Sequence, residues 1–233
     1  MMNKTPVAIV TGASRGLGAA VACWLGKVGA AVTLVARSVE KLGETGDEVR
    51  RLGGEPLVCR ADVSQYDACR KAVDKTLARF GRIDAVVNNA GIVQPISAIV
   101  RTDPADWRYN IEVNLIGPFN LIRAAAAALS RQNGRIVNVS SGAANLALES
   151  ISAYCTAKAA LNHFTRVLAV EEPELTAFAL RPGVVDTDMQ TFIRQEGPRA
   201  MPSDQADYYL QLKDRGELEP AAIPARSLSL IHI

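Results

Sequence analysis

Hydrophobic and polar positions divide the chain into short aliphatic runs that alternate with longer amphipathic stretches. The aliphatic runs predict strands at Val7–Val10, Val32–Ala36, Pro56–Arg60, Ala85–Asn88, Arg135–Val139 and Thr176–Leu180. The amphipathic stretches predict helices near residues 16–28, 38–52, 65–80, 104–130 and 152–171. Strands that are apolar on both faces and separated by helices are typical of a parallel sheet covered on both sides. We therefore predict one doubly wound α/β domain.

The composition argues against several classes of protein. The 233 residues include 26 basic and 24 acidic side chains, and the net charge of +2 comes without a basic block, so nothing indicates a nucleic-acid or membrane surface. The four cysteines and two histidines lack metal-ligand spacing, so we expect free thiols and no metal site. The N-terminus lacks the features of a signal peptide, and no run approaches the roughly 18 apolar residues of a membrane helix. We expect a soluble, cytoplasmic protein.

A glycine-rich turn, TGASRGLG, follows the first predicted strand at Thr11–Gly18. In a doubly wound sheet, ligands bind at the carboxyl ends of the strands. Gly12 permits a tight turn, Gly16 lets the backbone approach a pyrophosphate, and Gly18 lets the helix lie close to the sheet. The N-terminus of the helix then offers free N–H groups to the phosphates. In this strand–loop–helix context the spacing predicts a dinucleotide-binding site.

The end of the second predicted strand indicates which dinucleotide binds. An NAD-binding domain usually places Asp or Glu there, whereas this chain has Arg37, followed by Ser38, with Arg15 in the glycine-rich turn. Two guanidinium groups near one ribose suit a 2′-phosphate, the alternative being that both are ordinary surface arginines. The absent carboxylate favours NADP(H). Asp62 and Val63, after the third strand, are expected at the adenine, with the carboxylate against its amino group.

Tyr154 and Lys158 lie four residues apart in an alanine-rich helical stretch, AYCTAKAA, so they share one helix face. Such a pair occurs on many ordinary surface helices, and the spacing alone favours a packing role. The alternative is a phenol held beside a cation so that the phenol can exchange its proton. The surrounding motifs decide between the two.

Several motifs in the expected order carry a family resemblance. Asn88-Asn89-Ala90-Gly91 follows the fourth strand, Ser140-Ser141-Gly142 follows the fifth, and Arg181-Pro182-Gly183 follows the sixth. Together with TGASRGLG and Tyr-x-x-x-Lys, they make the chain resemble the short-chain dehydrogenase/reductase family from residue 5 to about 227. The resemblance implies a Rossmann-type NADP(H)-binding reductase domain over residues 1–227.

The resemblance also implies a role for each matching residue. Tyr154 matches the catalytic acid/base, Lys158 its activator and ribose ligand, Ser141 the carbonyl-binding hydroxyl, and Asn114 the helix residue that orders a proton-relay water. Thr187 matches the threonine that holds the nicotinamide carboxamide and is also expected to cap the next helix, together with its neighbours Asp186 and Asp188. The full set expected to bind the cofactor is Gly12, Ser14, Arg15, Gly16, Leu17, Gly18, Arg37, Ser38, Asp62, Val63, Asn89, Ala90, Gly91, Tyr154, Lys158, Pro182, Gly183, Val185 and Thr187.

A narrower resemblance appears from residue 167 onward. VLAVEEPELTAFALRPGVVDTDMQ, followed by LKDRGELE, is similar to the sepiapterin reductase and benzil reductase group, which reduces vicinal dicarbonyls and related carbonyls with NADPH. The resemblance implies a small carbonyl substrate and a homodimer. The alternatives are an NADP-linked alcohol dehydrogenase acting oxidatively and a non-catalytic NADP(H)-binding regulator.

The C-terminal segment departs from the family pattern. Members of the family normally continue into a seventh strand, and a carboxylate near the C-terminus of sepiapterin reductase anchors its pterin, but this chain has no counterpart of either. The last six residues, LSLIHI, also translate the end of a common transposon sequencing adaptor. We therefore expect residues 228–233 to be a non-native tail on a truncated chain, with one side of the sixth strand unpaired.

Overall fold

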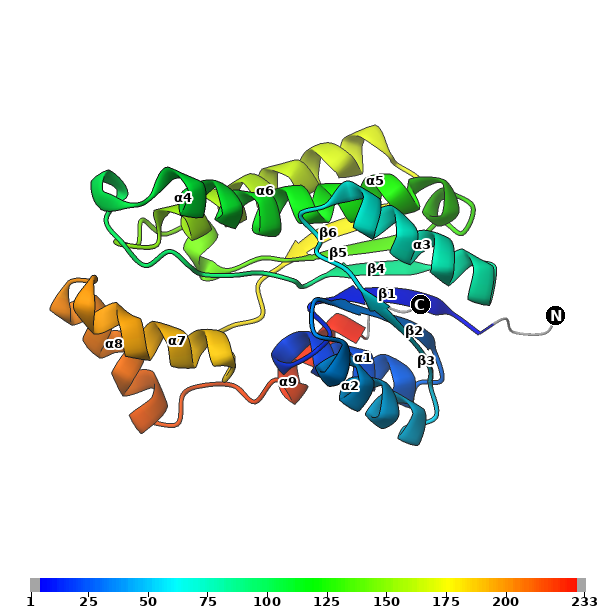
Figure 1. The fold of residues 1–233 in the computed structure, drawn as a ribbon, viewed down its shortest axis with the longest axis horizontal. Coiled ribbons are helices and arrows are strands. Elements are labelled where there is room, and N and C mark those ends of the chain that lie inside the picture. Colours follow the sequence, from blue (N-terminus) through cyan, green and yellow to red (C-terminus); the bar gives the residue numbers. More distant parts are fainter. Residues whose placement is uncertain (1–4, 230–233) are drawn as a thin grey trace.

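A computed structural model describes residues 5–229 and shows one six-stranded parallel sheet (Figure 1). The strand order is β3-β2-β1-β4-β5-β6, so the direction of winding reverses between β1 and β4. Each strand begins and ends within one residue of its predicted range. The strands are β1 (Val7–Thr11), β2 (Ala31–Ala36), β3 (Glu55–Arg60), β4 (Ala85–Asn88), β5 (Arg135–Val139) and β6 (Thr176–Leu180).

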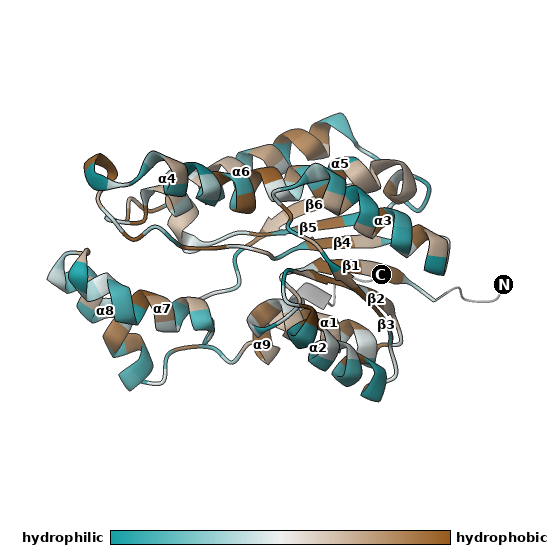
Figure 2. Cartoon of the chain, viewed as in Figure 1, coloured by the Kyte–Doolittle hydropathy of each residue, from teal (hydrophilic) through white to brown (hydrophobic). Residues whose placement is uncertain are grey.

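Helices cover both faces of the sheet (Figure 1). One layer contains α1 (Gly16–Lys27), α2 (Val39–Arg51) and the C-terminal α9 (Ala222–Ser229). The other contains α3 (Tyr66–Phe80), α4 (Pro104–Ile111), α5 (Gly117–Ser130) and α6 (Ser152–Glu171). Figure 2 shows hydrophilic residues on the outer turns of α2 and α3. The doubly wound fold predicted from the sequence is confirmed.

Side chains that point alternately to the two faces of the sheet build two apolar cores, one between the sheet and each helix layer. In β1, Ile9 packs into the cluster under α3 and α5, whereas Ala8 and Val10 pack into the cluster under α1 and α2. Successive side chains of a strand point to opposite faces, so a strand buried on both sides must be apolar throughout. All five residues of β1 are buried, which explains the continuous aliphatic run in the sequence.

The stretch predicted as one helix over residues 104–130 is interrupted. A π-helical turn, η2 (Glu112–Ile116), separates α4 from α5, and the buried Asn114 lies within it. The hydrophobic pattern runs unbroken through this segment, so periodicity does not reveal the turn. Such turns are frequent at functional sites. Within the described residues, Pro104–Ser130 is also the one stretch long and apolar enough to span a membrane, but its apolar window is 56% buried inside the fold, as in a core helix.

Two helices form a lobe beyond the sheet. α7 (Asp188–Glu196) and α8 (Ser203–Asp214) pack through a third apolar cluster that includes Ile193 and Tyr209. The chain leaves and re-enters the main body at one place, because Asp186 N donates to Glu219 O at 2.9 Å and Glu219 N donates to Val184 O at 2.9 Å. The lobe is therefore fixed at both of its ends.

The C-terminal helix α9 packs against α1. Ala225 is fully buried in the cluster under α1, and Trp24 Nε1 donates to the carbonyl of Ala222 at 3.1 Å. The sequence pattern did not predict α8 or α9. The expected domain boundary at residue 227 falls inside α9, and residues 230–233 of the suspected tail lie outside the described residues. Within the described residues, β6 is an edge strand of the sheet.

Candidate active site

A cavity of about 1360 Å³ lies at the carboxyl ends of the strands, where the winding reverses between β1 and β4. This is where a doubly wound sheet leaves room for a ligand. Of the residues predicted from the sequence for the site, two do not line the cavity. Gly18 and Asn114 lie behind its wall, and the other predicted site residues line it.

The glycine-rich turn is packed tightly against the loop after β4. Gly12 has φ +65°, and a Cβ there would lie 2.8 Å from Asn89 Nδ2. A Cβ at Gly18 would lie 2.4 Å from the same nitrogen and from Gly12 O. Asn89 Nδ2 donates to Thr11 O at 2.9 Å, which fixes the two loops together. Gly18 therefore serves close packing, as the sequence predicted.

The N-terminus of α1 opens into the cavity without a side-chain cap. Its N-cap residue, Arg15, makes no capping hydrogen bond, so the first-turn N–H groups remain available to an anion. The guanidinium of Arg15 instead pairs with the carboxylate of Asp188 at the start of α7, 2.7 Å away. The structure therefore places Arg15 at the predicted pocket but directs it across the cavity to the lobe.

The end of the cavity next to β2 and β3 contains a polar network centred on Tyr109, a residue that sequence reasoning missed. Arg37 Nη1 donates to Tyr109 Oη at 2.9 Å, and Tyr109 Oη donates to Asp62 Oδ2 at 3.4 Å. The other Asp62 oxygen accepts from the Ser64 backbone N–H at 3.0 Å. Arg37 and Asp62, which come from different strand ends, are thus brought to one wall. Tyr109 reaches them from α4, and nothing in its sequence context signalled this.

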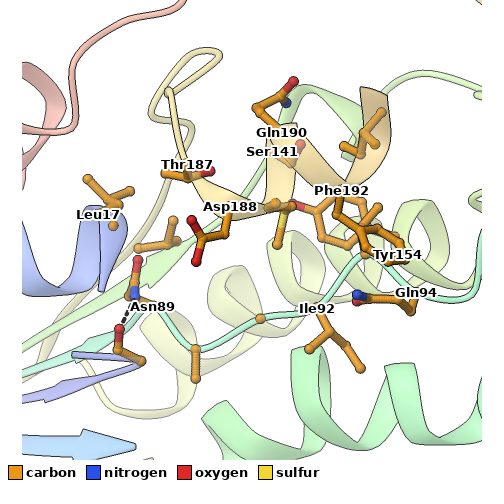
Figure 3. Close-up of a pocket in the computed structure, with 18 of the residues that line it drawn as sticks. Leu17, Asn89, Ile92, Gln94, Ser141, Tyr154, Thr187, Asp188, Gln190 and Phe192 are labelled. Carbon is orange, nitrogen blue, oxygen red and sulfur yellow. Dashed lines mark hydrogen bonds between the residues drawn. The ribbon is translucent and has the colours of Figure 1, made fainter. Parts of the chain in front are cut away.

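Ser141 and Tyr154 line the other end of the cavity (Figure 3). Burial raises the pKa of the Tyr154 phenol, and hydrogen bonding with Ser141 partly offsets that rise. Ser140 points the opposite way, and its hydroxyl donates to Asn162 Oδ1 at 2.6 Å. This is the arrangement expected when the two serines alternate at the end of a strand.

Lys158 is almost wholly removed from water, with 4% of its surface exposed. Its ammonium donates to the carbonyl of Val139 at 2.8 Å and lies 5.6 Å from the centre of the Tyr154 ring. Desolvation lowers the pKa of Lys158 to about 8. A buried ammonium that is held mainly by one carbonyl is costly, and it suits a ligand that brings further oxygen atoms.

Asn114 supports the wall of the cavity from behind. Its Oδ1 accepts from Ile92 N at 3.2 Å, and its Nδ2 donates to Ile92 O at 2.8 Å. A Cβ on Gly91 would lie 2.7 Å from Asn114 Oδ1 and 3.7 Å from Lys158 Nζ. The loop after β4 therefore passes between the asparagine and the lysine, and only a residue without a side chain fits there.

The loop after β6 forms the remaining side of the cavity, which Pro182, Gly183, Val185 and Thr187 line. Thr187 occupies the N-cap position of α7, but its hydroxyl donates to Val185 O at 3.3 Å and caps no helix N–H. The prediction of a side-chain cap by Thr187 is wrong, because the hydroxyl is turned back towards the Val185 carbonyl and its oxygen accepts from no N–H of the first turn. The neighbouring carboxylates also have other partners: Asp186 pairs with Lys213, and Asp188 pairs with Arg15.

No sequence motif marked the side chains around Tyr154 that a substrate would meet. Gln94 and Phe192 lie next to Tyr154 in Figure 3, and Leu148 and Tyr209 line the same end of the cavity. These residues come from the loop after β4, the loop before α6, and the two lobe helices. Because the sequence predicted no packing for the lobe, it could not place them together.

The site as a whole fits a nicotinamide dinucleotide. It combines glycines whose Cβ atoms would clash with the neighbouring loop, an uncapped helix N-terminus, a basic residue at the end of β2 and a buried ammonium beside a phenol. Residues 5–229 hold no group of three His, Cys, Asp or Glu side chains placed to bind a metal ion. All four cysteines are free thiols.

Comparison with known proteins gives matches over most of the chain. The family profile described as short chain dehydrogenase matches residues 6–197. An uncharacterized oxidoreductase of Saccharomyces cerevisiae is 33% identical over 222 residues, covering 94% of this chain and 86% of that protein. The crystal structure of the KRED1-Pglu enzyme is 38% identical with a TM-score of 0.92, covering 98% of this chain and 96% of that one. A metagenomic short-chain oxidoreductase in complex with NADP is 39% identical with a TM-score of 0.73, covering 77% and 83% of the two chains.

The buried ammonium generates a prediction about stability. Lys158→Met should stabilise the ligand-free protein at pH 7. The pKa of Lys158 is about 8 in the folded protein and 10.5 ordinarily, so the charged ammonium is less favourable in the folded state than in the unfolded chain. This pKa difference corresponds to a cost of about 3 kcal/mol in the free energy of folding. Methionine removes that cost, but about 1 kcal/mol is lost because the Val139 carbonyl loses its hydrogen-bond donor.

Urea denaturation of the two proteins at several pH values tests this. The greater stability of the variant should be constant below pH 8 and should shrink as the pH rises from about 8 towards 10.5. In this range Lys158 of the folded wild type has lost its proton while the unfolded chain still binds one, which stabilises the folded wild type progressively. Lys71→Met, at an exposed position on α3, is the matched control and should change little. Equal stability of Lys158→Met and wild type at pH 7 would contradict the prediction.

Proposed function

The chain belongs to the short-chain dehydrogenase family of oxidoreductases, which act on alcohol and ketone groups, and we propose that it is an NADPH-dependent carbonyl reductase. One observation carries the proposal: Ser141, Tyr154 and the buried Lys158 all line a cavity large enough for a dinucleotide. A non-catalytic regulator has no need of this set. The same residues also serve the reverse reaction, so an NADP-linked alcohol dehydrogenase is the second candidate function.

The cofactor proposed is NADP(H). Support comes from Arg37 at the end of β2, where a carboxylate would favour NAD. Its guanidinium is held by Tyr109, which leaves most of its donors free for a phosphate. Arg15 is the second cation proposed for the 2′-phosphate, and it must leave Asp188 to reach that group. The cofactor-binding set otherwise remains the one predicted from the sequence.

Reduction of a ketone requires a hydride and a proton, and when bound, NADPH supplies the hydride. Tyr154 supplies the proton: its phenolic O–H bond breaks as a new O–H bond forms on the carbonyl oxygen of the substrate. Burial raises the pKa of this phenol, so it remains protonated at neutral pH until the substrate oxygen becomes a stronger base. Ser141 donates a hydrogen bond to the same oxygen and stabilises the charge that develops there.

The proton given up by Tyr154 must then be replaced. Lys158, 5.6 Å from the ring, stabilises the phenolate by its positive charge. We propose that Asn114, behind Gly91, orders the water through which the proton returns. Lys158 is also proposed to bind the ribose next to the nicotinamide. Thr187 is proposed to bind the carboxamide group of the nicotinamide.

The substrate proposed is a vicinal dicarbonyl or a related small carbonyl. Support comes from the segment of this chain that resembles the sepiapterin and benzil reductase group. In this segment α6 ends at Glu171, and only a short turn leads to β6. The end of the cavity next to Tyr154 is largely apolar, with Leu148, Phe192 and Tyr209 in its wall. A flat, apolar diketone suits such a wall. A cytoplasmic location is part of the same proposal.

A homodimer is proposed from the exposed apolar side chains of α5 and α6. Phe119 is 46% exposed, Val167 39% and Val170 81%, and all three lie on the outer side of the helix layer. Exposed apolar groups on adjacent helices suit a symmetric interface, in which the same surface of two copies is covered.

The proposed reaction is tested by NADPH consumption with benzil and smaller vicinal diketones, compared with simple ketones, and by NADP reduction with secondary alcohols. Tyr154→Phe keeps the ring but removes the proton donor, so kcat should fall by about three orders of magnitude or more while NADPH still binds. A variant that retains a tenth of wild-type activity would exclude Tyr154 as the donor. Activity with alcohols alone would favour the second candidate.

The cofactor assignment predicts the effect of reversing one charge. Arg37→Asp should raise KM for NADPH by roughly 100-fold and lower KM for NADH, because a carboxylate repels a 2′-phosphate and accepts from a free ribose hydroxyl. Arg131→Asp, exposed at the C-terminus of α5 near the opposite edge of the sheet, makes the same charge change as a control. A wild-type preference for NADH would overturn the assignment.

The assembly proposal predicts the mass in solution. Light scattering at micromolar concentration should give about twice the chain mass of 24.9 kDa. Phe119→Glu should shift the protein towards the monomer, because it places charge in the apolar surface. Val39→Glu, at an exposed position at the start of α2 in the other helix layer, makes the same kind of change away from this surface and is the control. A wild-type monomer would contradict the proposal.

A further inference from the structure

Asn110 is a fully buried polar residue on α4 whose contacts do not serve the helix alone. Its Nδ2 donates to Gln94 O at 2.6 Å and to Ile92 O at 3.1 Å. Its Oδ1 accepts from Asn114 Nδ2 at 2.9 Å. Every polar atom of the side chain therefore has a partner, and all of these partners belong to the wall behind the active site.

These contacts determine which way the Asn114 amide faces. Asn114 Nδ2 is surrounded by three acceptors, namely Ile92 O, Asn110 O and Asn110 Oδ1. A flipped amide would place the Asn114 oxygen against those acceptors and its NH2 group against the Ile92 N–H. Asn110 contributes two of the three acceptors and so enforces the orientation that presents Oδ1 towards Gly91.

The same side chain also fixes the loop after β4. The carbonyls of Ile92 and Gln94 are two residues apart, and one amide group holds both of them. The Gln94 side chain is exposed and lies beside Tyr154 in the cavity (Figure 3). A shift of this backbone therefore moves the pocket wall next to the proton donor.

We propose that Asn110 is a positioning residue for carbonyl reduction, which holds the Asn114 amide and the Ile92–Gln94 backbone as one rigid unit at the active site. The inference rests on the proposed function, in which Asn114 orders the proton-relay water. Asn110 touches neither cofactor nor substrate in this scheme, since it does not line the cavity. Its effect on the reaction passes through Asn114 and through the Ile92–Gln94 backbone, which Asn114 also holds at Ile92.

The competing explanation is that Asn110 contributes only to stability, as buried hydrogen-bonded asparagines do. The fold contains a matched residue for comparison. Asn120 on α5 is 5% exposed, and its Nδ2 donates to two backbone carbonyls, Val63 O at 3.0 Å and Ser64 O at 3.2 Å. It makes the same kind of contact away from the Ser141–Tyr154 end.

The test compares Asn110→Leu, Asn110→Ser and Asn120→Leu. Asn110→Leu should lower kcat roughly 10- to 100-fold, because a small misplacement of catalytic groups has effects of that size, while KM for NADPH changes less than about threefold. Asn110→Ser, which retains a short donor and acceptor, should recover part of kcat and keeps the test open if the leucine variant does not fold. Asn120→Leu should lower thermal stability by a similar amount with kcat unchanged.

A double-mutant cycle distinguishes positioning from a general structural role. If Asn110 acts through Asn114, Asn110→Leu should have little further effect on kcat in an Asn114→Ala background. If the two substitutions lower kcat by independent factors that multiply in the double variant, the inference is overturned. An unchanged kcat in Asn110→Leu would also overturn it.

An activity-independent measurement separates this inference from the proposed function. Hydrogen exchange of the Asn114 side-chain amide, followed by NMR, should be slow in wild type and in Asn120→Leu and fast in Asn110→Leu. Slow exchange in all three overturns the inference, even if the wild-type protein reduces carbonyls. A wild-type protein without turnover refutes the proposed function, and the exchange experiment then still decides whether Asn110 holds Asn114.

Discussion

The ammonium of Lys158 is the feature around which the active site is organised. Moving a charge out of water is unfavourable unless neighbouring dipoles replace the solvent. In the described residues the carbonyl of Val139 provides part of that replacement, and the loop at Gly91 closes the remaining space. The position of the charge depends on β5 for the carbonyl, on α6 for the side chain and on the loop after β4 for exclusion of water. Three elements distant in sequence must therefore meet before the ammonium is tolerated, and the same meeting brings Ser141 to Tyr154.

Rigid and adaptable parts of the site are separated in space. The nucleotide side is built from backbone in close contact, where Gly12, Gly18 and the amide of Asn89 leave no room for another atom. The side next to Tyr154 is built from larger side chains of the lobe, such as Phe192 and Tyr209. This division lets the substrate side vary while the nucleotide side is kept, because backbone contacts persist through side-chain changes.

Most of the fold and the principal site residues could be predicted from the sequence, for a physical reason. Strands buried on both faces must be apolar throughout, so the runs around Ile9 and Ile136 were visible, and polar residues directly after such strands must lie at one edge of a parallel sheet. The π-turn at Asn114 was not visible, because its hydrophobic pattern is that of a continuous helix. The positions of Tyr109 and Gln94 were not visible either, since contacts between distant elements put each of them in the cavity wall. The cap expected at Thr187 was wrong for a local reason: the sequence shows the preference of a residue type for the N-cap position but not the direction in which its hydroxyl turns.

The bridge between Val185 and Glu219 has a consequence for how such proteins diversify. The polypeptide between these residues begins and ends at one paired position, so its length and content can change while the two anchor points stay fixed. Insertion at such a closed pair costs little, because loop-closure entropy grows slowly with length. The segment between Val185 and Glu219 can therefore be replaced as one unit by that of a relative, while the sheet and the glycine-rich turn stay the same. Recombination at these two positions would exchange Thr187 together with the substrate-facing side chains, so new substrate preferences would arise with only the glycine-rich side of the nucleotide site unaltered.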